Sequence, residues 1–568
     1  MTTTIQDDVS GIGSIGLRHR GAARAQGQWA LGHREPLNTN ERTKADDDGL
    51  NVRRRIEQIY APAGFASIDP TDLNGRFRWW GLYTQRRPGI PGGATASMEP
   101  HELSDEYFML RVRSDGGRLN LDQLRAVSQV SSRFARDSAD LTDRQNVQLH
   151  WVRIEDVPEI WRLLESVGLT TAEACGDTPR VVLGSPLAGV AADEIVDGTP
   201  AIEEIVQRYV GDPELSNLPR KFKSAVSGSP HQDVAHEVND LSFVGVVHPE
   251  HGAGFDVYVG GGLSTNPMLA RRLGAFVTVD EVPEVWGGII RLFRDYGYRR
   301  LRHRARLKFL VADWGVERFR QVLEVEYLGR ALTDGPAPPP PPLGRRDHVG
   351  VHPQADGRSY VGAAPLVGRV SGTTLAAVAD LAQAAGSDRV RLTTEQKIVV
   401  LDVQPERAAA VMEGLERLGL DVGASTFRRG TMACTGLEFC KLAIVETKSR
   451  AASLVTELES RLPTFDAPLS IHVNGCPNSC ARIQVADIGL KGSIVSDSEG
   501  DRVEGFQVHL GGALGHQAAL GRKPRGLKVT AEDLPDFVER IATRYSERRR
   551  SGQTFAQWAR SADDGELS

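Results

Sequence analysis

The chain has 568 residues, of which 40% are hydrophobic and 25% are charged, and its formal net charge is −6. This composition is typical of globular proteins, excludes disordered and collagen-like chains, and gives no reason to expect nucleic-acid binding. No apolar run reaches about 18 residues, so we expect no membrane span. No shorter apolar stretch follows the first basic residues either, so we expect no secretory signal and place the protein in the cytoplasm.

The N-terminal region, residues 1–90, has no counterpart later in the chain, and we expect it to form an added arm. Its glycines Gly11, Gly13 and Gly16 match the dinucleotide pattern G-x-G-x-x-G, but no strand pattern precedes them and no helix pattern follows. We therefore expect a flexible terminus there. The arm ends in RFRWWGLYTQRR, from Arg76 to Arg87, which is too aromatic and cationic for a solvated tail.

After the arm, the chain shows the same coarse order of elements twice. Alternating apolar residues predict strands, and a 3.6-residue period predicts helices. In the first half these are strands at 107–113 and 147–152 and helices at 121–135, 157–169 and 282–297. In the second half they are strands at 360–370 and 397–403 and helices at 373–385 and 534–550. The fold class is α+β, or mixed α/β, with internal pseudo-two-fold symmetry.

Direct self-similarity supports an ancient duplication. The segment GFDVYVGGGLSTNPMLARR begins at Gly254, and GFQVHLGGALGHQAALGRK begins 251 residues later at Gly505, with 8 of 19 positions identical. Leu141 and Leu392 begin a second matching pair at the same separation. The Pro-rich stretch GPAPPPPP links the two halves, because it continues neither a helix nor a central strand. The expected domains are 1–90, 91–165, 166–330, a linker at 331–348, 349–417 and 418–560.

Four of the five cysteines lie in the last quarter of the chain, as C-x5-C at Cys434 and Cys440 and C-x3-C at Cys476 and Cys480. A structural zinc site is one interpretation, although zinc sites commonly use tighter C-x2-4-C pairs. An iron–sulfur cluster, whose thiolates bind different corners, tolerates the looser spacing. Spacing alone leaves both open.

These cysteines, with NGCPNSC, the duplication, LTDRQNVQLH and the GGGLS turn, resemble the sirohaem-containing ferredoxin-dependent sulfite and nitrite reductases, most closely the actinobacterial assimilatory sulfite reductases. The resemblance runs from about Gly27 to Trp558. It implies two ferredoxin-like half-domains and two larger domains that carry sirohaem and a [4Fe–4S] cluster. It also implies that Cys434, Cys440, Cys476 and Cys480 bind the cluster, with Cys480 shared with the sirohaem iron.

The same resemblance implies the residues around the substrate and the cofactor. An anion pocket needs cations, and the family's four substrate-site cations correspond to Arg111, Arg180, Lys221 and Lys223. The implied contacts of the sirohaem carboxylates are Arg144, Gln145, Asn146, Arg306, Lys308, Gln396 and Lys397. We interpret His150 as a core histidine and not as a haem ligand. The glycines from Gly260 to Gly262 predict a close backbone approach, either to the macrocycle or to a packed strand.

The remaining cysteine, Cys175, and Tyr83 of the arm match positions that a thioether joins in the actinobacterial sulfite reductases. We therefore expect a Tyr83–Cys175 cross-link beside the sirohaem and a preference for sulfite. The alternative is a small buried Cys and a core Tyr that are not joined.

The predicted function is six-electron reduction of sulfite to sulfide with electrons from reduced ferredoxin, by a monomer. The alternatives are a ferredoxin-dependent nitrite reductase on the same scaffold and, remotely, a non-catalytic zinc-binding protein. With no flavin or nicotinamide motif in the chain, an acidic iron–sulfur donor has to dock. Candidate docking cations are Arg522, Lys523, Arg525 and Lys528, for which a solvated charge run is the alternative.

Overall fold

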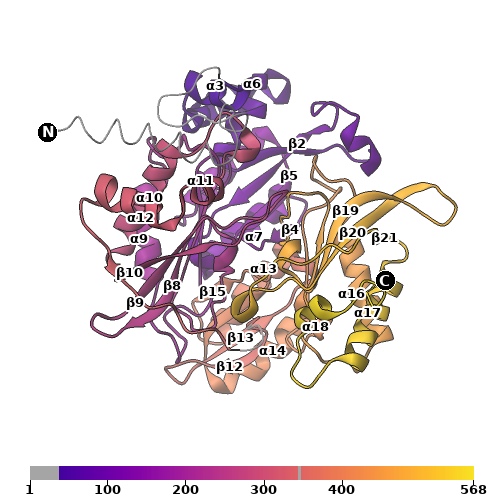
Figure 1. Ribbon diagram of the computed structural model, residues 1–568. Coiled ribbons are helices and arrows are strands. Elements are labelled where there is room, and N and C mark those ends of the chain that lie inside the picture. Colours follow the sequence, from indigo (N-terminus) through magenta and orange to yellow (C-terminus); the bar gives the residue numbers. More distant parts are fainter. Residues whose placement is uncertain (1–36, 343–346, 568) are drawn as a thin grey trace.

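The computed structural model describes residues 37–342 and 347–567, which form four β-sheets with helices packed on their faces (Figure 1). The glycine pattern at Gly11–Gly16 and the first part of the arm lie outside these residues. The mixed α+β class predicted from the sequence is confirmed. The first half of the chain lies on one side of the molecule and the second half on the other, with helices α7 and α13 between them.

The two smaller sheets exchange a short strand. The first has the order β1-β2-β5-β4-β14, and the second has the order β12-β13-β16-β15-β3. Strand β14 therefore comes from the second half of the chain and pairs antiparallel with β4, while β3 comes from the first half and pairs with β15. Their bounds are β1 Leu82–Arg86, β2 Ser104–Val112, β3 Arg118–Asn120, β4 Ala139–Leu141, β5 Val147–Val152, β12 Gly350–Pro353, β13 Ser359–Ala363, β14 Arg369–Val370, β15 Arg389–Leu392 and β16 Ile398–Val403.

This exchange breaks the strand predicted at 360–370. Val367 has φ 47°, so the chain leaves the sheet after β13, turns, and re-enters the other half's sheet as β14. The helices that cover these sheets are α7 Leu121–Phe134, α8 Val157–Glu165, α13 Gly372–Ala384 and α14 Ala408–Arg417. Helices α7 and α13 approach closely, because a Cβ at Gly372 would lie 2.6 Å from the carbonyl oxygen of Ser128. One hydrophobic core accordingly spans both half-domains.

Each larger sheet mixes parallel and antiparallel strands, in the orders β11-β10-β9-β8-β7-β6 and β17-β18-β19-β20-β21. The strand bounds are β6 Pro179–Gly184, β7 Phe222–Ser227, β8 Leu241–His248, β9 Gly252–Val259, β10 Arg271–Val277, β11 Thr333–Asp334, β17 Thr431–Ala433, β18 Ile471–Asn474, β19 Ile488–Ser496, β20 Arg502–Leu510 and β21 Lys528–Thr530. The main helices beside them are α9 Thr199–Tyr209, α10 Val282–Tyr296, α11 Leu307–Trp314, α12 Val316–Val322, α16 Lys448–Arg461, α17 Leu534–Arg548 and α18 Phe555–Ser561. Strands β6, β7 and β8 are parallel, as are β17, β18 and β19, so the loops after these strands leave from one edge of each sheet.

Reciprocal hydrogen bonds join the two large domains. The carboxylate of Glu237 accepts from the backbone N–H of Gly515 in the second half, and the side-chain amide of Gln484 donates to the carbonyl of Ser264 in the first half, at 3.1 Å. Ser264 and Gly515 are 251 residues apart, which is the period of the duplication. The duplicated units therefore face each other about a pseudo-two-fold axis, and the loops at their sheet edges meet there.

The described part of the arm docks on the first half. Helix α3, Thr39–Asp46, is capped by Asn38, whose side chain also donates to the carbonyls of Arg299 and Arg300. The indole N–H of Trp79 donates to the carbonyl of Ser216 at 2.8 Å. Strand β1 then adds to the edge of the first half-domain, so the arm is part of the folded body.

Candidate functional site

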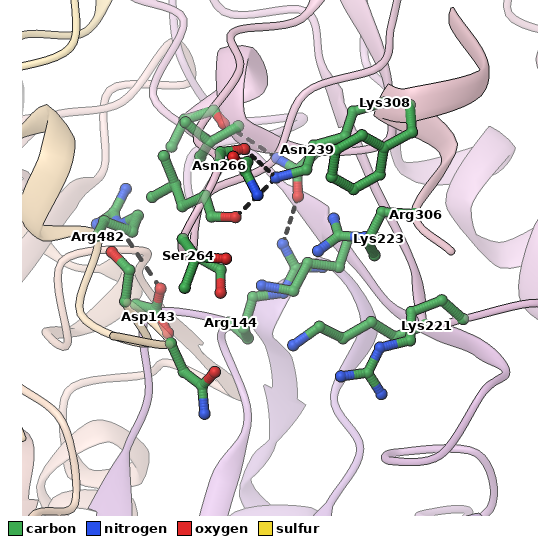
Figure 2. Close-up of a pocket in the computed structure, with 18 of the residues that line it drawn as sticks. Asp143, Arg144, Lys221, Lys223, Asn239, Ser264, Asn266, Arg306, Lys308 and Arg482 are labelled. Atoms are coloured by element: carbon green, nitrogen blue, oxygen red, sulfur yellow. Dashed lines mark hydrogen bonds and ion pairs between the residues drawn. The ribbon is translucent and has the colours of Figure 1, made fainter. Parts of the chain in front are cut away.

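A cationic cavity of about 510 Å³ lies where loops of both halves meet (Figure 2). The first half contributes the turn at Asp143 and Arg144, the start of β7, the 263–266 loop and the start of α11. The second half contributes Asn478, Ser479 and Arg482 from the loop after β18. The cationic lining residues are Arg144, Arg220, Lys221, Lys223, Arg302, Arg306, Lys308 and Arg482.

Lys221 and Lys223 supply positive charge that this part of the chain leaves uncompensated. In the described residues, neither side chain forms a hydrogen bond or an ion pair. Burial, and then the charge of Lys223, lower the pKa of Lys221 well below its usual range. Burial and the nearby Arg144 lower the pKa of Lys223 to about 7. Both side chains are half-buried, and lysines in this setting without a partner favour an anionic ligand.

Asp240 organises the floor of the cavity. Its fully buried carboxylate accepts from Nε and Nη2 of Arg306 at 3.0 and 2.8 Å and from the backbone N–H of Lys223 at 2.9 Å. One carboxylate thus fixes Arg306 and the start of β7 together, as bidentate Arg–carboxylate pairs do.

Lys308 and the glycine turn complete the wall beside Arg306. The ammonium group of Lys308 donates to the carbonyls of Gly262, Leu263 and Asn266 at 3.1, 2.9 and 2.5 Å. Burial lowers the pKa of this lysine to about 7. A Cβ at Gly261 would lie 2.5 Å from the carbonyl oxygens of Glu237 and Asn239, which confirms the close backbone approach predicted at the glycines.

Arg144 also lines the cavity and is anchored at its back. It donates from Nη1 to Asn239 at 2.6 Å and from Nη2 to the carbonyl of Val181 at 2.7 Å. Burial lowers its pKa to about 10.

Four other predicted residues, Gln145, Asn146, Gln396 and Lys397, are buried in turns away from the cavity lining. Gln145 accepts from and donates to the backbone of Gly184 at 3.0 and 2.8 Å, and Gln396 does the same at Ala433, at 3.3 and 3.1 Å. Asn146 accepts from Thr142, and Lys397 donates to the carbonyl of Arg428. These contacts stabilise the fold, and a role in binding a cofactor stays a prediction for all four.

Arg111, Arg180, Tyr83 and Cys175 form a second group, outside the cavity lining. Burial lowers the pKa of Arg111, but Cys175 and then Tyr83 raise it, and the result lies above the ordinary value. Its Nη2 donates to Gln148 at 2.8 Å, and its buried Nε has no hydrogen-bond partner in the described residues. Arg180 donates to the carbonyls of Ala174 and Gly176, which places it against the Cys175 loop.

Tyr83 is 36% exposed, whereas Cys175 is 1% exposed. Despite this partial exposure, desolvation and then the neighbouring Cys175 thiol raise the pKa of the Tyr83 phenol. The side chains of Tyr83 and Cys175 therefore lie close enough for their charges to interact, and the bond between them stays a prediction.

The four clustered cysteines follow two parallel strands. Cys434 follows β17, and Cys476 and Cys480 lie in the loop after β18, so the register Ala433↔Val473 puts both loops at one sheet edge. The backbone N–H of Gly475 donates to the Cys434 sulfur at 3.2 Å. Burial and then the charge of Cys480 raise the pKa of Cys434 to about 12, and the same causes raise the pKa of Cys440 and Cys476.

All-sulfur ligands suit iron–sulfur clusters or zinc. Within residues 37–342 and 347–567, no group of three or more His, Cys, Asp or Glu side chains is arranged to hold a single metal ion. The four thiols nevertheless lie close enough for their charges to interact, as the ligands of one iron–sulfur cluster would. Cys480 also raises the pKa of Lys223 and of Arg111, so it lies near these cations as well as near the other thiols.

Sequence reasoning missed Arg220, Arg302 and Arg482. Arg302 binds the carboxylate of Asp177 with two hydrogen bonds of 2.7 and 2.9 Å, and Arg220 lies 3.6 Å from the same carboxylate. Arg482 has φ 56° and lies 3.6 Å from Asp143 on the side of the cavity opposite Lys221 (Figure 2). The basic run LRHRAR and the position of Arg482 just after Cys480 were the available signals.

His150 and the candidate docking cations lie apart from the cavity. His150 is buried and stacks on Phe439 with ring centroids 3.8 Å apart, in agreement with a core histidine. Arg522 donates to the carbonyl of Ala562, whereas Lys523, Arg525 and Lys528 are exposed. In the described residues, no helix has the length and apolarity needed to cross a membrane.

Comparison with known proteins gives two family matches, each in duplicate. Residues 175–332 and 424–561 match the nitrite and sulphite reductase 4Fe-4S domain, and residues 101–167 and 352–418 match the nitrite/sulfite reductase ferredoxin-like half domain. Sulfite reductase [ferredoxin] 2 of Mycolicibacterium paratuberculosis is 59% identical, covering 96% of this chain and 98% of that protein. Sulfite reductase [ferredoxin] of Mycobacterium tuberculosis is 58% identical over the same shares.

A more distant relative is the assimilatory ferredoxin-dependent nitrite reductase of Haloferax mediterranei, 36% identical over 91% of this chain and 90% of that protein. The solved structure of the Mycobacterium tuberculosis NirA protein superimposes with a TM-score of 0.93 at 57% identity, covering 95% of this chain and all of that one.

Proposed function

This chain belongs to the nitrite and sulphite reductase family, and from that premise we propose that it is an oxidoreductase that reduces sulfite to sulfide with electrons from reduced ferredoxin. The balanced reaction is HSO3⁻ + 6 e⁻ + 6 H⁺ → HS⁻ + 3 H2O. Relatives named ferredoxin-dependent sulfite reductases are 58–59% identical, whereas those named nitrite reductases are 36–37% identical. This gap favours sulfite over the second candidate, nitrite reduction. We propose that the protein acts as a monomer in the cytoplasm.

The residues present fit the two groups that the family implies. The cavity offers an excess of cations, and the buried Nε and Nη1 of Arg482 form no hydrogen bond within the described residues, which suits a cofactor rich in carboxylates. We propose that Cys434, Cys440, Cys476 and Cys480 hold a [4Fe–4S] cluster and that Cys480 is shared with a sirohaem. Together these groups supply single-electron storage and an iron atom that accepts an anion.

We assign anion binding and proton supply to Lys221, Lys223, Arg111 and Arg180. The guanidinium groups keep their charge throughout the physiological range and therefore fix the anion electrostatically. Lys223, with its pKa lowered to about 7, both holds and releases a proton near neutral pH. It is therefore the group best suited to donate protons as the sulfite oxygens leave as water. Arg306 and Lys308 keep the adjoining wall rigid through Asp240 and three backbone carbonyls.

We also propose the Tyr83–Cys175 thioether. Forming this bond breaks the S–H bond of Cys175 and one C–H bond of the Tyr83 ring and releases two protons and two electrons, so it would need an added oxidant such as dioxygen. The buried thiol lies next to the phenol, near Arg111 and Arg180, which brings the two reacting groups together. The bond would join the edge strand β1 to the loop before β6, and so hold the arm beside the anion site.

The observation that carries the proposal is the group of cations in the cavity, in which Lys221 and Lys223 have no partner among the described residues, close to four clustered thiols. The test is an absorption spectrum with iron and acid-labile sulfide analysis of the purified protein. We expect a Soret-type band and about four sulfides per chain. A colourless protein containing one zinc ion per chain would refute the proposal.

A further inference from the structure

Arg86, in the last position of β1, is a buried cation that the proposed reaction does not use. Its side chain is 1% exposed, and it donates to Thr95 Oγ1 at 3.0 Å and to the carbonyls of Ile90 and Pro91 at 3.2 and 3.1 Å. These partners are all neutral. Within the described residues no carboxylate comes within ion-pair distance, and Nε has no hydrogen-bond partner.

The neighbourhood of Arg86 identifies the missing negative charge. Its backbone N–H donates to the carbonyl of Phe439 at 2.8 Å, one residue before Cys440. Burial lowers the pKa of Arg86, and among the charges that oppose this effect Cys440 comes first and Glu504 second. A β-bulge between Thr84 and Arg86 shifts the register of β1 against β2, and bulges of this kind redirect side chains.

A second cation flanks the same cysteine. Lys441 donates to the hydroxyls of Thr84 and Ser104 at 2.5 and 2.8 Å, and forms no ion pair with any described carboxylate. Both hydroxyls lie on the strands β1 and β2 beside Arg86. Two partly or fully buried cations without carboxylate partners in the described residues thus lie near one thiol.

A buried charge is stable only when an opposite charge or several dipoles compensate it. We propose that Arg86 and Lys441 are the counter-charges of the iron–sulfur cluster at its Cys440 corner, and that they raise its reduction potential. This inference rests on the proposed function. When the cluster accepts one electron from a reduced donor, it gains one negative charge. A nearby buried cation stabilises that reduced state more than the oxidised state, because little solvent screens the interaction.

The segment from Arg86 to Thr95 is held against the loop that contains Cys440. Thr95 Oγ1 donates to the carbonyl of Ala443 at 2.6 Å, and a Cβ at Gly92 would lie 1.7 Å from the carbonyl oxygen of Ile444. The arm therefore provides Tyr83 to the anion site and Arg86 to the cluster, from two positions on one short strand.

The experiment is a mediated redox titration of the holoenzyme at pH 7, in which the reduced cluster is quantified by electron paramagnetic resonance. At a fixed potential we expect Arg86→Gln to lower the ratio of reduced to oxidised cluster about tenfold, which corresponds to a midpoint about 59 mV more negative. Arg86→Lys keeps the charge and should stay near the wild type. Arg87→Gln, the matched control, removes an exposed charge one residue away and should shift the midpoint less, because solvent screens it.

If the Arg86→Gln protein does not assemble the cluster, the titration is repeated with Lys441→Gln, whose midpoint should shift in the same direction. A wild-type protein without a cluster would refute the proposed function. A cluster whose midpoint moves no further in Arg86→Gln or Lys441→Gln than in Arg87→Gln would overturn this inference alone.

Discussion

Replacing Asp240 by Asn tests how the cavity is held together. The fully buried carboxylate of Asp240 accepts two hydrogen bonds from Arg306 and one from the backbone N–H of Lys223. Asparagine offers one acceptor oxygen, and its amide nitrogen would face a donor, so at least one contact is lost and Arg306 loses its counter-charge. Breaking a buried ion pair in this way costs about 3–5 kcal/mol, and since one oxygen remains we expect about 3 kcal/mol of destabilisation.

The assay is urea unfolding of the holoenzyme followed by intrinsic fluorescence. A matched control is Asp536→Asn, which removes an ion pair of 2.6 Å with Arg461 at a site where the carboxylate is 70% exposed. Exposed pairs contribute about 0–1 kcal/mol, so this variant should unfold close to the wild type. If Asp240→Asn is no less stable than Asp536→Asn, the argument that Asp240 organises the cavity is wrong.

Three further outcomes are expected. Burial lowers the pKa of Lys223 to about 7, so this lysine is charged below that pH and loses its charge as the pH rises through it. The decrease of kcat/KM for sulfite above pH 7 should therefore be weaker in Lys223→Arg, whose guanidinium stays charged. The protonation of sulfite itself affects both enzymes equally, so identical pH profiles would count against a role for Lys223. Peptide mass mapping should find the Tyr83 and Cys175 peptides linked with the loss of two hydrogens, and Tyr83→Phe should release them; separate, unmodified wild-type peptides would exclude the cross-link. Cys480→Ser should abolish the magnetic coupling between haem and cluster together with activity, whereas full activity would show that another cysteine is shared.

The sequence was sufficient to predict the duplication and the mixed α+β class. Each of these depends on local periodicity or on a repeated pattern. The strand exchange was not predictable, because β14 has only two residues and pairs with a strand more than two hundred residues away. Such a short segment has no period of its own, and its pairing partner is decided by tertiary packing.

Positions that match between the two halves distinguish predicted site residues with a structural role from those that line the cavity. Gln145 and Gln396 occupy matching turns, and each clamps a backbone segment in its own half, while Gln145 also donates to the carbonyl of Leu392 in the second half. A residue kept in both halves therefore has a structural role that does not depend on the cavity. Lys223 and Ser470 occupy matching positions as well, since their backbone N–H groups donate to Asp240 and Asp487. There the side chains differ, and only the lysine faces the cavity.

Lining residues such as Arg220 and Arg302 were missed for a related reason. A basic residue in a loop is more often solvated than buried, and only the fold shows that Asp177 anchors both. The sequence therefore predicts a site for an anion, while the geometry shows which cations line the cavity.

The most direct test of the account is the stoichiometry and selectivity of the reaction in the purified holoenzyme. Sulfide and oxidised donor are measured together under limiting sulfite with a reduced ferredoxin, and kcat/KM is then determined for sulfite and nitrite under the same conditions. The account predicts six electrons consumed for each sulfide formed and a higher kcat/KM for sulfite. A protein that carries both cofactors but forms no sulfide, or that reduces nitrite with the higher kcat/KM, would contradict it.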